Sequence, residues 1–300
     1  MQDMNTTTIL SDFALQQIDV GDVTINLRHG GNGPPLLLLH GYPQTHVIWH
    51  KIADRLARDF TLIMPDLRGY GDSSRPAGSA DHGNYAKRVM AQDMATVMQK
   101  LGHARYGVCG HDRGGRVAHR LALDHPQAVS RLMLLDISPT ATMYAGTDQA
   151  FATAYFHWFM LIQPSPIPET LVGNSGPFLL HTFLGGWGSS GNTYIDPAAM
   201  AEYERCFIRP DAIHSACEDY RAAASIDLVH DAADAGRRIA CPLHLIWGRN
   251  GIVGRMFDPI GDWQARASGP VTGTAFDAGH FIPEQTPDAL LAEMQAFFGG

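Results

Sequence analysis

Short apolar runs that alternate with longer amphipathic segments constrain the fold of this chain more than any other feature. The runs are VTINLRH (23–29), PPLLLLH (34–40), FTLIMPD (60–66), YGVCG (106–110), RLMLLD (131–136), LHLIWG (243–248) and VTGTAF (271–276). Continuous apolar strands are typical of parallel sheets covered by helices on both faces. Between them lie segments with helical character at about 46–58, 85–101, 114–125 and 287–298. The pattern predicts an α/β protein with a doubly wound, mostly parallel sheet.

The alternation breaks between residues 139 and 230. This stretch shows no strand rhythm, and it contains a proline-rich loop at 163–168 and a glycine-rich loop at 184–191. It is also rich in aromatic side chains, which makes a solvated linker the weaker interpretation. We therefore expect residues 1–138 and 231–300 to form the core and residues 139–230 to form a helical cap inserted into it.

Composition and charge narrow the class of protein. Hydrophobic residues make up 45% of the chain and charged residues 17%, and no apolar run reaches the ~18 residues of a membrane span. A net charge of −8 without a Lys/Arg run argues against nucleic-acid or anionic-membrane partners. The four cysteines lack CxxC spacing and the N-terminus lacks a secretory signal, so we expect reduced thiols and a cytoplasmic protein. An anionic substrate would need a local positive pocket.

Asp112 follows the apolar run at 106–110 in the sequence GHDRGGR (110–116). Glycines on either side of it permit a sharp strand-to-helix turn that exposes the middle residue at the carboxyl end of the sheet, where sites form in open α/β proteins. A carboxylate there can displace a leaving group from an sp³ carbon and form an ester that water then cleaves. We predict that Asp112 is the nucleophile; the alternative is a structural acid that caps the following helix.

Two further groups follow other strands. His280 comes after the last strand in GHF, and Asp136 ends RLMLLD. We predict that His280 is the base for the hydrolytic water and that Asp136 holds its tautomer. An acid after the next strand is disfavoured, because LHLIWG is followed by Arg-Asn-Gly and the nearest acid there is Asp258. The alternative for Asp136 is a side chain that only caps the strand end.

The segments HGYPQT, PDLRGYGDSSRP, GHDRGGRVAHRLALDHP and LLDISPT together resemble the fluoroacetate dehalogenases, α/β hydrolases related to haloalkane dehalogenases and epoxide hydrolases. The resemblance covers nearly the whole chain and is strongest in the core motifs. It implies an α/β-hydrolase fold, cleavage of the carbon–halogen bond of a short 2-haloacid without a cofactor or metal, and a homodimer. It also implies a halide site made by His157, Trp158 and Tyr220, whose N–H and O–H groups are the donors that a departing fluoride needs.

Arg113 and Arg116 indicate what else the substrate carries. The residue after the nucleophile is usually Trp in haloalkane dehalogenases and epoxide hydrolases. This chain differs from them, because Arg113 places a positive charge at that position. Residues three apart share a helix face, so both guanidinium groups can hold one carboxylate in bidentate fashion. Salt bridges to acids of the protein are the alternative for both arginines.

The oxyanion of the opening ester needs two donors, for which we expect the backbone N–H groups of Tyr42 and Arg113. Trp187 lies between glycines, and we expect it either to line the tunnel or simply to pack.

These residues predict a two-step hydrolase that converts fluoroacetate to glycolate and fluoride through an aspartyl ester. The closest alternative is an epoxide hydrolase with the same Asp/His/Asp residues, in which Tyr220 and a second tyrosine, Tyr155 or Tyr203, would open the ring. A second alternative is a hydrolase-fold receptor that binds a small ligand without turnover.

Overall fold

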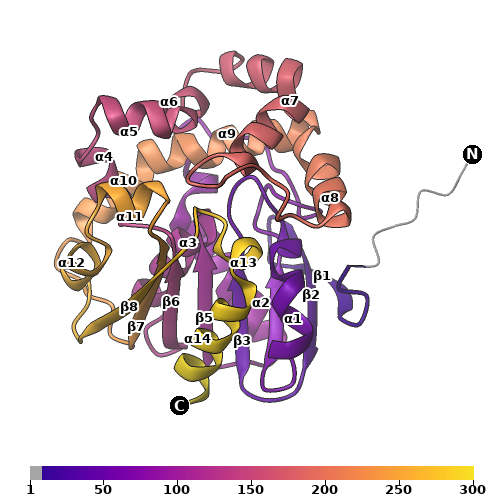
Figure 1. The fold of residues 1–300 in the computed structure, drawn as a ribbon, viewed down its shortest axis with the longest axis vertical. Coiled ribbons are helices and arrows are strands. Elements are labelled where there is room, and N and C mark those ends of the chain that lie inside the picture. The colour runs from indigo at the N-terminus through magenta and orange to yellow at the C-terminus, as the bar shows by residue number, and fades with distance from the viewer. Residues whose placement is uncertain (1–8) are drawn as a thin grey trace, which may run out of the picture.

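The computed structural model describes residues 9–300 and contains an eight-stranded sheet with the order β1-β2-β4-β3-β5-β6-β7-β8 (Figure 1). The strands are β1 Ala14–Asp19, β2 Thr24–Gly31, β3 Pro35–Leu39, β4 Thr61–Pro65, β5 Tyr106–His111, β6 Val129–Leu135, β7 Leu243–Gly248 and β8 Val271–Phe276. β2 is antiparallel to β1 and β4, and all other neighbours are parallel. The predicted mostly parallel sheet is confirmed.

The first strand was not among the predicted ones. β1 pairs with β2 from Ala14 opposite His29 to Asp19 opposite Thr24, at the edge of the sheet. Its sequence ALQQID is exposed at all but one position, so it lacks the apolar run that reveals a buried strand. Edge strands are held by their backbone pairing, which hydrophobic periodicity does not report.

Helices cover both faces of the sheet. The helices of the core are α1 His50–Leu56, α2 Lys87–Lys100, α3 Arg113–Asp124, α11 Ile252–Met256, α12 Pro259–Gln264, α13 Ile282–Gln285 and α14 Pro287–Gly299, with the 3₁₀ turns η1 His46–Trp49 and η2 Gly83–Tyr85. α2 packs on α3, and their buried side chains join one core cluster; α1 packs on α14, and theirs join a second. Alternate residues of the central strands divide between the clusters, with Leu37 in one and Leu38 in the other.

The segment between β6 and β7 is helical. It contains α4 Thr140–Ala145, α5 Gln149–Ala154, α6 Phe156–Leu161, α7 Ile167–Gly185, α8 Pro197–Phe207, α9 Pro210–Ala224 and α10 Ile226–Ala233, which we call the inserted helices. Figure 1 shows most of them above the sheet, at the end from which β3, β5 and β6 lead into the loops that follow them. They therefore face the edge where the carboxyl ends of the parallel strands meet.

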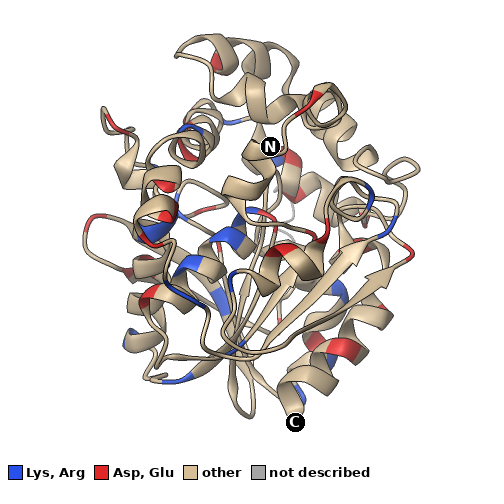
Figure 2. Ribbon diagram, turned by 90° about the vertical axis from the view of Figure 1, so that its left-hand side faces the viewer, with Lys and Arg blue, Asp and Glu red and all other residues tan. Residues whose placement is uncertain are grey.

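Positive and negative residues occur on the same elements. In the view of Figure 2, Lys and Arg residues are interspersed with Asp and Glu residues on the same elements. None of the helices in residues 9–300 combines the length and apolar character needed to cross a membrane.

Gly114 lies at the contact between α3 and β3, and its replacement tests how tightly this contact is packed. A Cβ atom on Gly114 would lie 2.3 Å from the carbonyl oxygen of His40 and 2.6 Å from the carbonyl carbon of Leu39. Because backbone atoms cannot yield as a side chain does, we expect Gly114→Ala to lower the free energy of unfolding in urea by about 3 kcal/mol.

The matched control is Gly173→Ala on α7, where nothing lies within 4 Å of the added atom. Alanine is the better helix former, so this variant should be neutral or more stable by up to about 1 kcal/mol. Equal unfolding midpoints for the two variants would contradict the packing described here.

Candidate active site

Asp112 occupies a strained turn between β5 and α3. Its backbone has φ 47° and ψ −114°, a conformation that a non-glycine residue rarely adopts. It stands at the N-cap position of α3, yet its side chain makes no capping hydrogen bond. The backbone of Gly41 approaches closely, since a Cβ there would lie 2.5 Å from the Asp112 Cβ. The turn thus directs the carboxyl away from its own helix and toward the loop after β3.

Neighbouring groups favour the ionised form of Asp112. The backbone N–H of Tyr42 donates to Oδ1 at 3.0 Å. Burial alone would raise the pKa of Asp112, but attraction to His280, and then to Arg116, lowers it below its usual value. The carboxylate is therefore charged at neutral pH, which is the form that can attack carbon.

His280 connects the two predicted acids. Its Nδ1 lies 2.6 Å from Asp136 Oδ2, and its Nε2 lies 3.9 Å from Asp112 Oδ2. The contact with Asp136 orients the ring so that Nδ1 faces Asp136 and Nε2 faces Asp112. The backbone N–H of His280 donates to the carbonyl of Trp187 at 3.1 Å, which fixes the loop that carries the ring.

Asp136 is held from the neighbouring strand. The N–H of Gly248, at the end of β7, donates to its Oδ1 at 3.0 Å. Asp136 therefore bridges two strand ends and contacts His280 at the same time. Burial raises the pKa of Asp136, while the hydrogen bond with His280 acts in the opposite direction. Asp258, the acid of the disfavoured alternative, instead caps α12 through the N–H of Gly261.

Arg113 makes the salt bridge that we considered as the alternative to substrate binding. Its Nε and Nη2 donate to the two carboxylate oxygens of Asp219 on α9 at 2.8 and 2.9 Å, and Nη2 also donates to the Asp219 carbonyl. Its remaining nitrogen, Nη1, is buried without a hydrogen-bond partner in the described structure. Only this nitrogen of Arg113 is available to a ligand.

Arg116 has no acidic partner within residues 9–300. Its Nη1 donates to the Ser138 carbonyl and to Thr140 Oγ1, its Nη2 contacts the sulfur of Met143, and its Nε is buried without a partner. Burial, and then repulsion from Arg113, lowers its pKa. A buried guanidinium that only neutral groups contact is costly, so an anion beside it is favourable.

The three residues predicted to bind halide lie next to the arginines. His157 and Trp158 on α6 have ring centroids 5.7 and 6.4 Å from that of Tyr220 on α9. The guanidinium carbon of Arg113 lies 4.2 Å from the Tyr220 ring centroid, and that of Arg116 lies 4.8 Å from the Trp158 ring. Burial lowers the pKa of His157 to about 3, so its ring is neutral at neutral pH, and its Nδ1 is unpartnered among the described residues.

Tyr42 and Trp187 pack around the same group. The Tyr42 ring stacks on His157 with centroids 6.0 Å apart and meets Tyr220 edge-on at 5.3 Å. Trp187 lies 4.4 Å from His157 and 5.4 Å from His280 by ring centroid, and it is 9% exposed. Trp187 thus contacts both the predicted base and a predicted halide residue.

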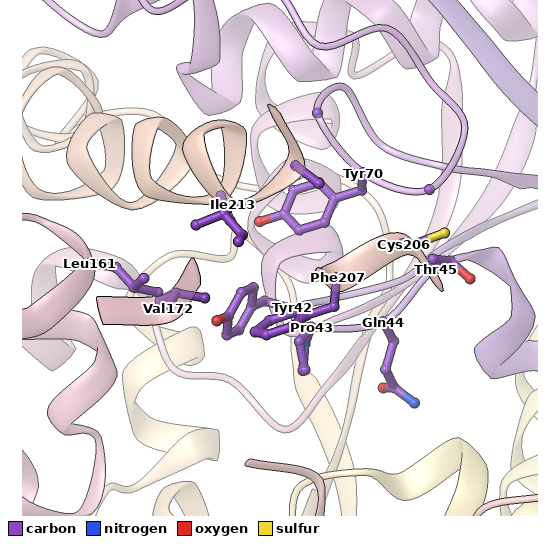
Figure 3. A pocket seen from close by; sticks show the side chains of 14 residues that line it. Tyr42, Pro43, Gln44, Thr45, Tyr70, Leu161, Val172, Cys206, Phe207 and Ile213 are labelled. Atoms are coloured by element: carbon purple, nitrogen blue, oxygen red, sulfur yellow. The ribbon is translucent and has the colours of Figure 1, made fainter. Parts of the chain in front are cut away.

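A mostly apolar pocket lies beside Tyr42 (Figure 3). Leu161, Val172, Phe207 and Ile213 of the inserted helices contribute to its lining. In the figure the Tyr42 ring extends toward Val172. This lining offers little to a carboxylate.

The sequence analysis missed Asp219, the partner of Arg113, and Lys87, which contacts the same carboxylate. The sequence offered one weak signal for Asp219, its position next to Tyr220, a predicted halide residue, on a helix whose buried side chains also include Glu218 and Arg221. Within residues 9–300, no group of three or more His, Cys, Asp or Glu residues is arranged to hold a metal ion.

Comparisons with known proteins agree with this architecture. The family model of the alpha/beta hydrolase fold matches residues 34–287. The fluoroacetate dehalogenase of Burkholderia sp is 43% identical over 95% of this chain and 93% of its own length. The soluble epoxide hydrolase of Corynebacterium sp. (strain C12) is 33% identical over 89% of this chain and 91% of its own length.

A solved structure is similar as well. The crystal structure of an alpha/beta hydrolase from Nostoc sp PCC 7120 superimposes with a TM-score of 0.94 and 53% identity, over 96% of this chain and 98% of that one. The predicted resemblance is confirmed, and the chain belongs to the α/β hydrolase family.

Proposed function

We propose that this protein is a hydrolytic dehalogenase that cleaves the carbon–halogen bond of short 2-haloacids and converts fluoroacetate to glycolate and fluoride. The observation that carries the proposal is the buried guanidinium of Arg116, which has no acidic partner in residues 9–300 and belongs to the helix that begins at Asp112. Such a site calls for a substrate anion next to the nucleophile. The printed name of the Burkholderia relative supports the same substrate class.

In the first step the substrate carboxylate binds Arg116 Nε and Arg113 Nη1, the two unpartnered guanidinium nitrogens. Asp112 Oδ2 attacks the α-carbon from the side opposite the halogen, the carbon–halogen bond breaks, and the electron pair leaves with the halide. His157, Trp158 and Tyr220 donate to the departing ion. Donors that strengthen as charge develops lower the barrier more than donors to the neutral halogen.

In the second step His280 Nε2 takes a proton from a water that attacks the carboxyl carbon of the Asp112 ester. Asp112 Oδ1 becomes the oxyanion, and the Tyr42 N–H already donates to this atom at 3.0 Å. The N–H of Arg113 is the second donor. Asp136 stabilises the imidazolium that forms. Collapse of the tetrahedral intermediate breaks the ester bond, and the departing alkoxide oxygen takes the proton from His280, which releases glycolate and restores the base.

Epoxide hydrolysis is the second candidate, and one observation favours it. The hydroxyl of Tyr155 is buried without a partner among the described residues, and its ring lies 6.3 Å from that of His280. Together with Tyr220 it offers the two tyrosine donors that ring opening needs. Tyr203 does not, because its hydroxyl donates to Glu284 at 2.6 Å. A neutral epoxide, however, leaves the charge of Arg116 uncompensated.

We also propose that the protein is a homodimer that associates through α7. Ile167, Leu171 and Phe178 on this helix are 51%, 51% and 71% exposed, and Ile208, 48% exposed, follows α8, which packs on α7. Clustered exposed apolar side chains are typical of association surfaces.

The reaction is tested with a fluoride electrode and a halide assay. Fluoroacetate and chloroacetate should be hydrolysed, while a neutral haloalkane and styrene oxide should react at least about 100-fold more slowly. Arg116→Gln should reduce kcat/KM for the haloacetates by about 10- to 100-fold, because hydrogen bonds to a charged group contribute roughly 1.5–3 kcal/mol. Activity on the haloalkane alone would remove the basis for carboxylate binding, and diol formation alone would select the epoxide hydrolase.

The ester intermediate is tested by replacing the base. His280→Asn should still form the ester but fail to hydrolyse it, so mass spectrometry after incubation with chloroacetate should show Asp112 carrying a carboxymethyl group. In the unaltered enzyme, a single turnover in ¹⁸O-water should place label in the Asp112 carboxylate. Label found only in glycolate after a single turnover would mean that water attacks the substrate directly.

The dimer is tested by sedimentation. The unaltered protein should sediment at twice the chain mass, and Phe178→Glu should shift it toward the monomer because a buried, unpaired carboxylate opposes association. Val229→Glu on α10, at a residue 61% exposed, is the control and should leave the dimer intact. A monomer at micromolar concentration for all three proteins would contradict the proposal.

A further inference from the structure

We propose that Asp219 is a positioning residue that sets how Arg113 meets the substrate. Asp219 lies on α9 and is fully buried. The inference rests on the proposed function, because it assumes that Arg113 binds the substrate carboxylate.

The carboxylate of Asp219 is itself fixed by donors from several elements. Oδ2 accepts from Arg113 Nε at 2.8 Å and from the Tyr70 hydroxyl at 2.6 Å. Oδ1 accepts from Arg113 Nη2 at 2.9 Å and from the ammonium group of Lys87 on α2. Each oxygen therefore has two donors, and rotation of the carboxylate would break several hydrogen bonds at once. This leaves Asp219 one orientation, which it imposes on Arg113.

The guanidinium of Arg113 is constrained on two sides. Asp219 binds the edge formed by Nε and Nη2, and the ring of Tyr220 covers one face at 4.2 Å from the central carbon. A guanidinium has five N–H donors in a rigid plane, and Asp219 occupies those of Nε and Nη2. The two N–H groups of Nη1 are left for the substrate. Without Asp219 the guanidinium of Arg113 could rotate and present a different edge to the substrate.

Asp219 also offsets buried positive charge beside the site. Together with Asp227, which lies 3.6 Å from the Lys87 ammonium group, it compensates Arg113 and Lys87, whereas Arg116 has no acidic partner in residues 9–300. Attraction to Arg113 and Lys87 outweighs burial and keeps the pKa of Asp219 below its usual value, so the neutralising charge persists at neutral pH.

The test is Asp219→Asn, which keeps the size of the side chain and removes its charge. KM for chloroacetate should rise about 10- to 100-fold while kcat changes less than about threefold, because the substrate loses its charged hydrogen bond to a misoriented Arg113, which contributes roughly 1.5–3 kcal/mol. A lower KM would mean that the freed charge of Arg113, and not its orientation, controls binding. Binding of acetate, measured by calorimetry, should weaken by the same factor. Binding of acetamide, the neutral isostere, should change less than about threefold.

Asp93→Asn is the matched control. Asp93 is buried and accepts from Nε and Nη2 of Arg68 at 2.8 Å each, so it forms the same kind of pair away from Asp112. Its replacement should cost similar stability and leave KM for chloroacetate unchanged. If both variants change acetate and acetamide binding alike, Asp219 has only a structural role.

A milder variant keeps the test decisive if Asp219→Asn does not fold. Tyr70→Phe removes one donor to Asp219 Oδ2, and it should raise KM for chloroacetate by about three- to tenfold with kcat retained. An unchanged KM in this variant would overturn the positioning role.

Failure of the proposed function can be told apart from failure of this inference. If the unaltered enzyme hydrolyses no haloacetate, the proposed function fails. Loss of acetate binding in Asp219→Asn would still support the positioning of Arg113.

Discussion

The turn at Asp112 exists because three segments of backbone pass closer together than side chains would allow. Gly41 lies against the Asp112 side chain, and Gly110 and Gly114 lie against the backbone of the elbow and of β3. The positive φ of Asp112 is costly by itself, and packing on all sides maintains it. The positions of the carboxyl relative to the Tyr42 N–H and to His280 follow from this turn. Without this turn, the Tyr42 N–H and the ring of His280 would not face the same carboxylate.

Buried charge is the second constraint. Buried arginines at the site differ from those elsewhere in whether an acidic side chain pairs with them. Elsewhere in the described chain, buried arginines such as Arg68 and Arg120 pair with carboxylates. At the site, Arg113 is paired and Arg116 is not. An unpaired buried guanidinium destabilises the empty protein and stabilises a complex with an anion. Binding energy for a small substrate, which has few atoms to contribute, can come from relieving that cost.

The inserted helices supply the proposed halide donors and the acidic partner of Arg113. Every hydrogen-bond donor proposed for the halide comes from α6 or α9, and the partner of Arg113 comes from α9 as well. In the proposed mechanism the core carries the nucleophile, the base and both arginines, while the inserted helices carry the halide donors and Asp219, the partner of Arg113. This division agrees with similarity to both a fluoroacetate dehalogenase and a soluble epoxide hydrolase.

Local features of the sequence were sufficient to predict seven of the eight strands, the strand-to-helix turn and the placement of Asp136 and His280 after their strands, because periodicity and glycine spacing act over a few residues. β1 was not predicted because an exposed edge strand has no run of apolar residues.

The sequence by itself therefore determined the fold class and which side chains stand at the carboxyl ends of the strands. Only the tertiary structure decided that Arg113 pairs with Asp219, 106 residues away, and that Arg116 meets no acidic partner among residues 9–300. Such pairings depend on how α9 packs over the sheet, and no local pattern encodes that packing.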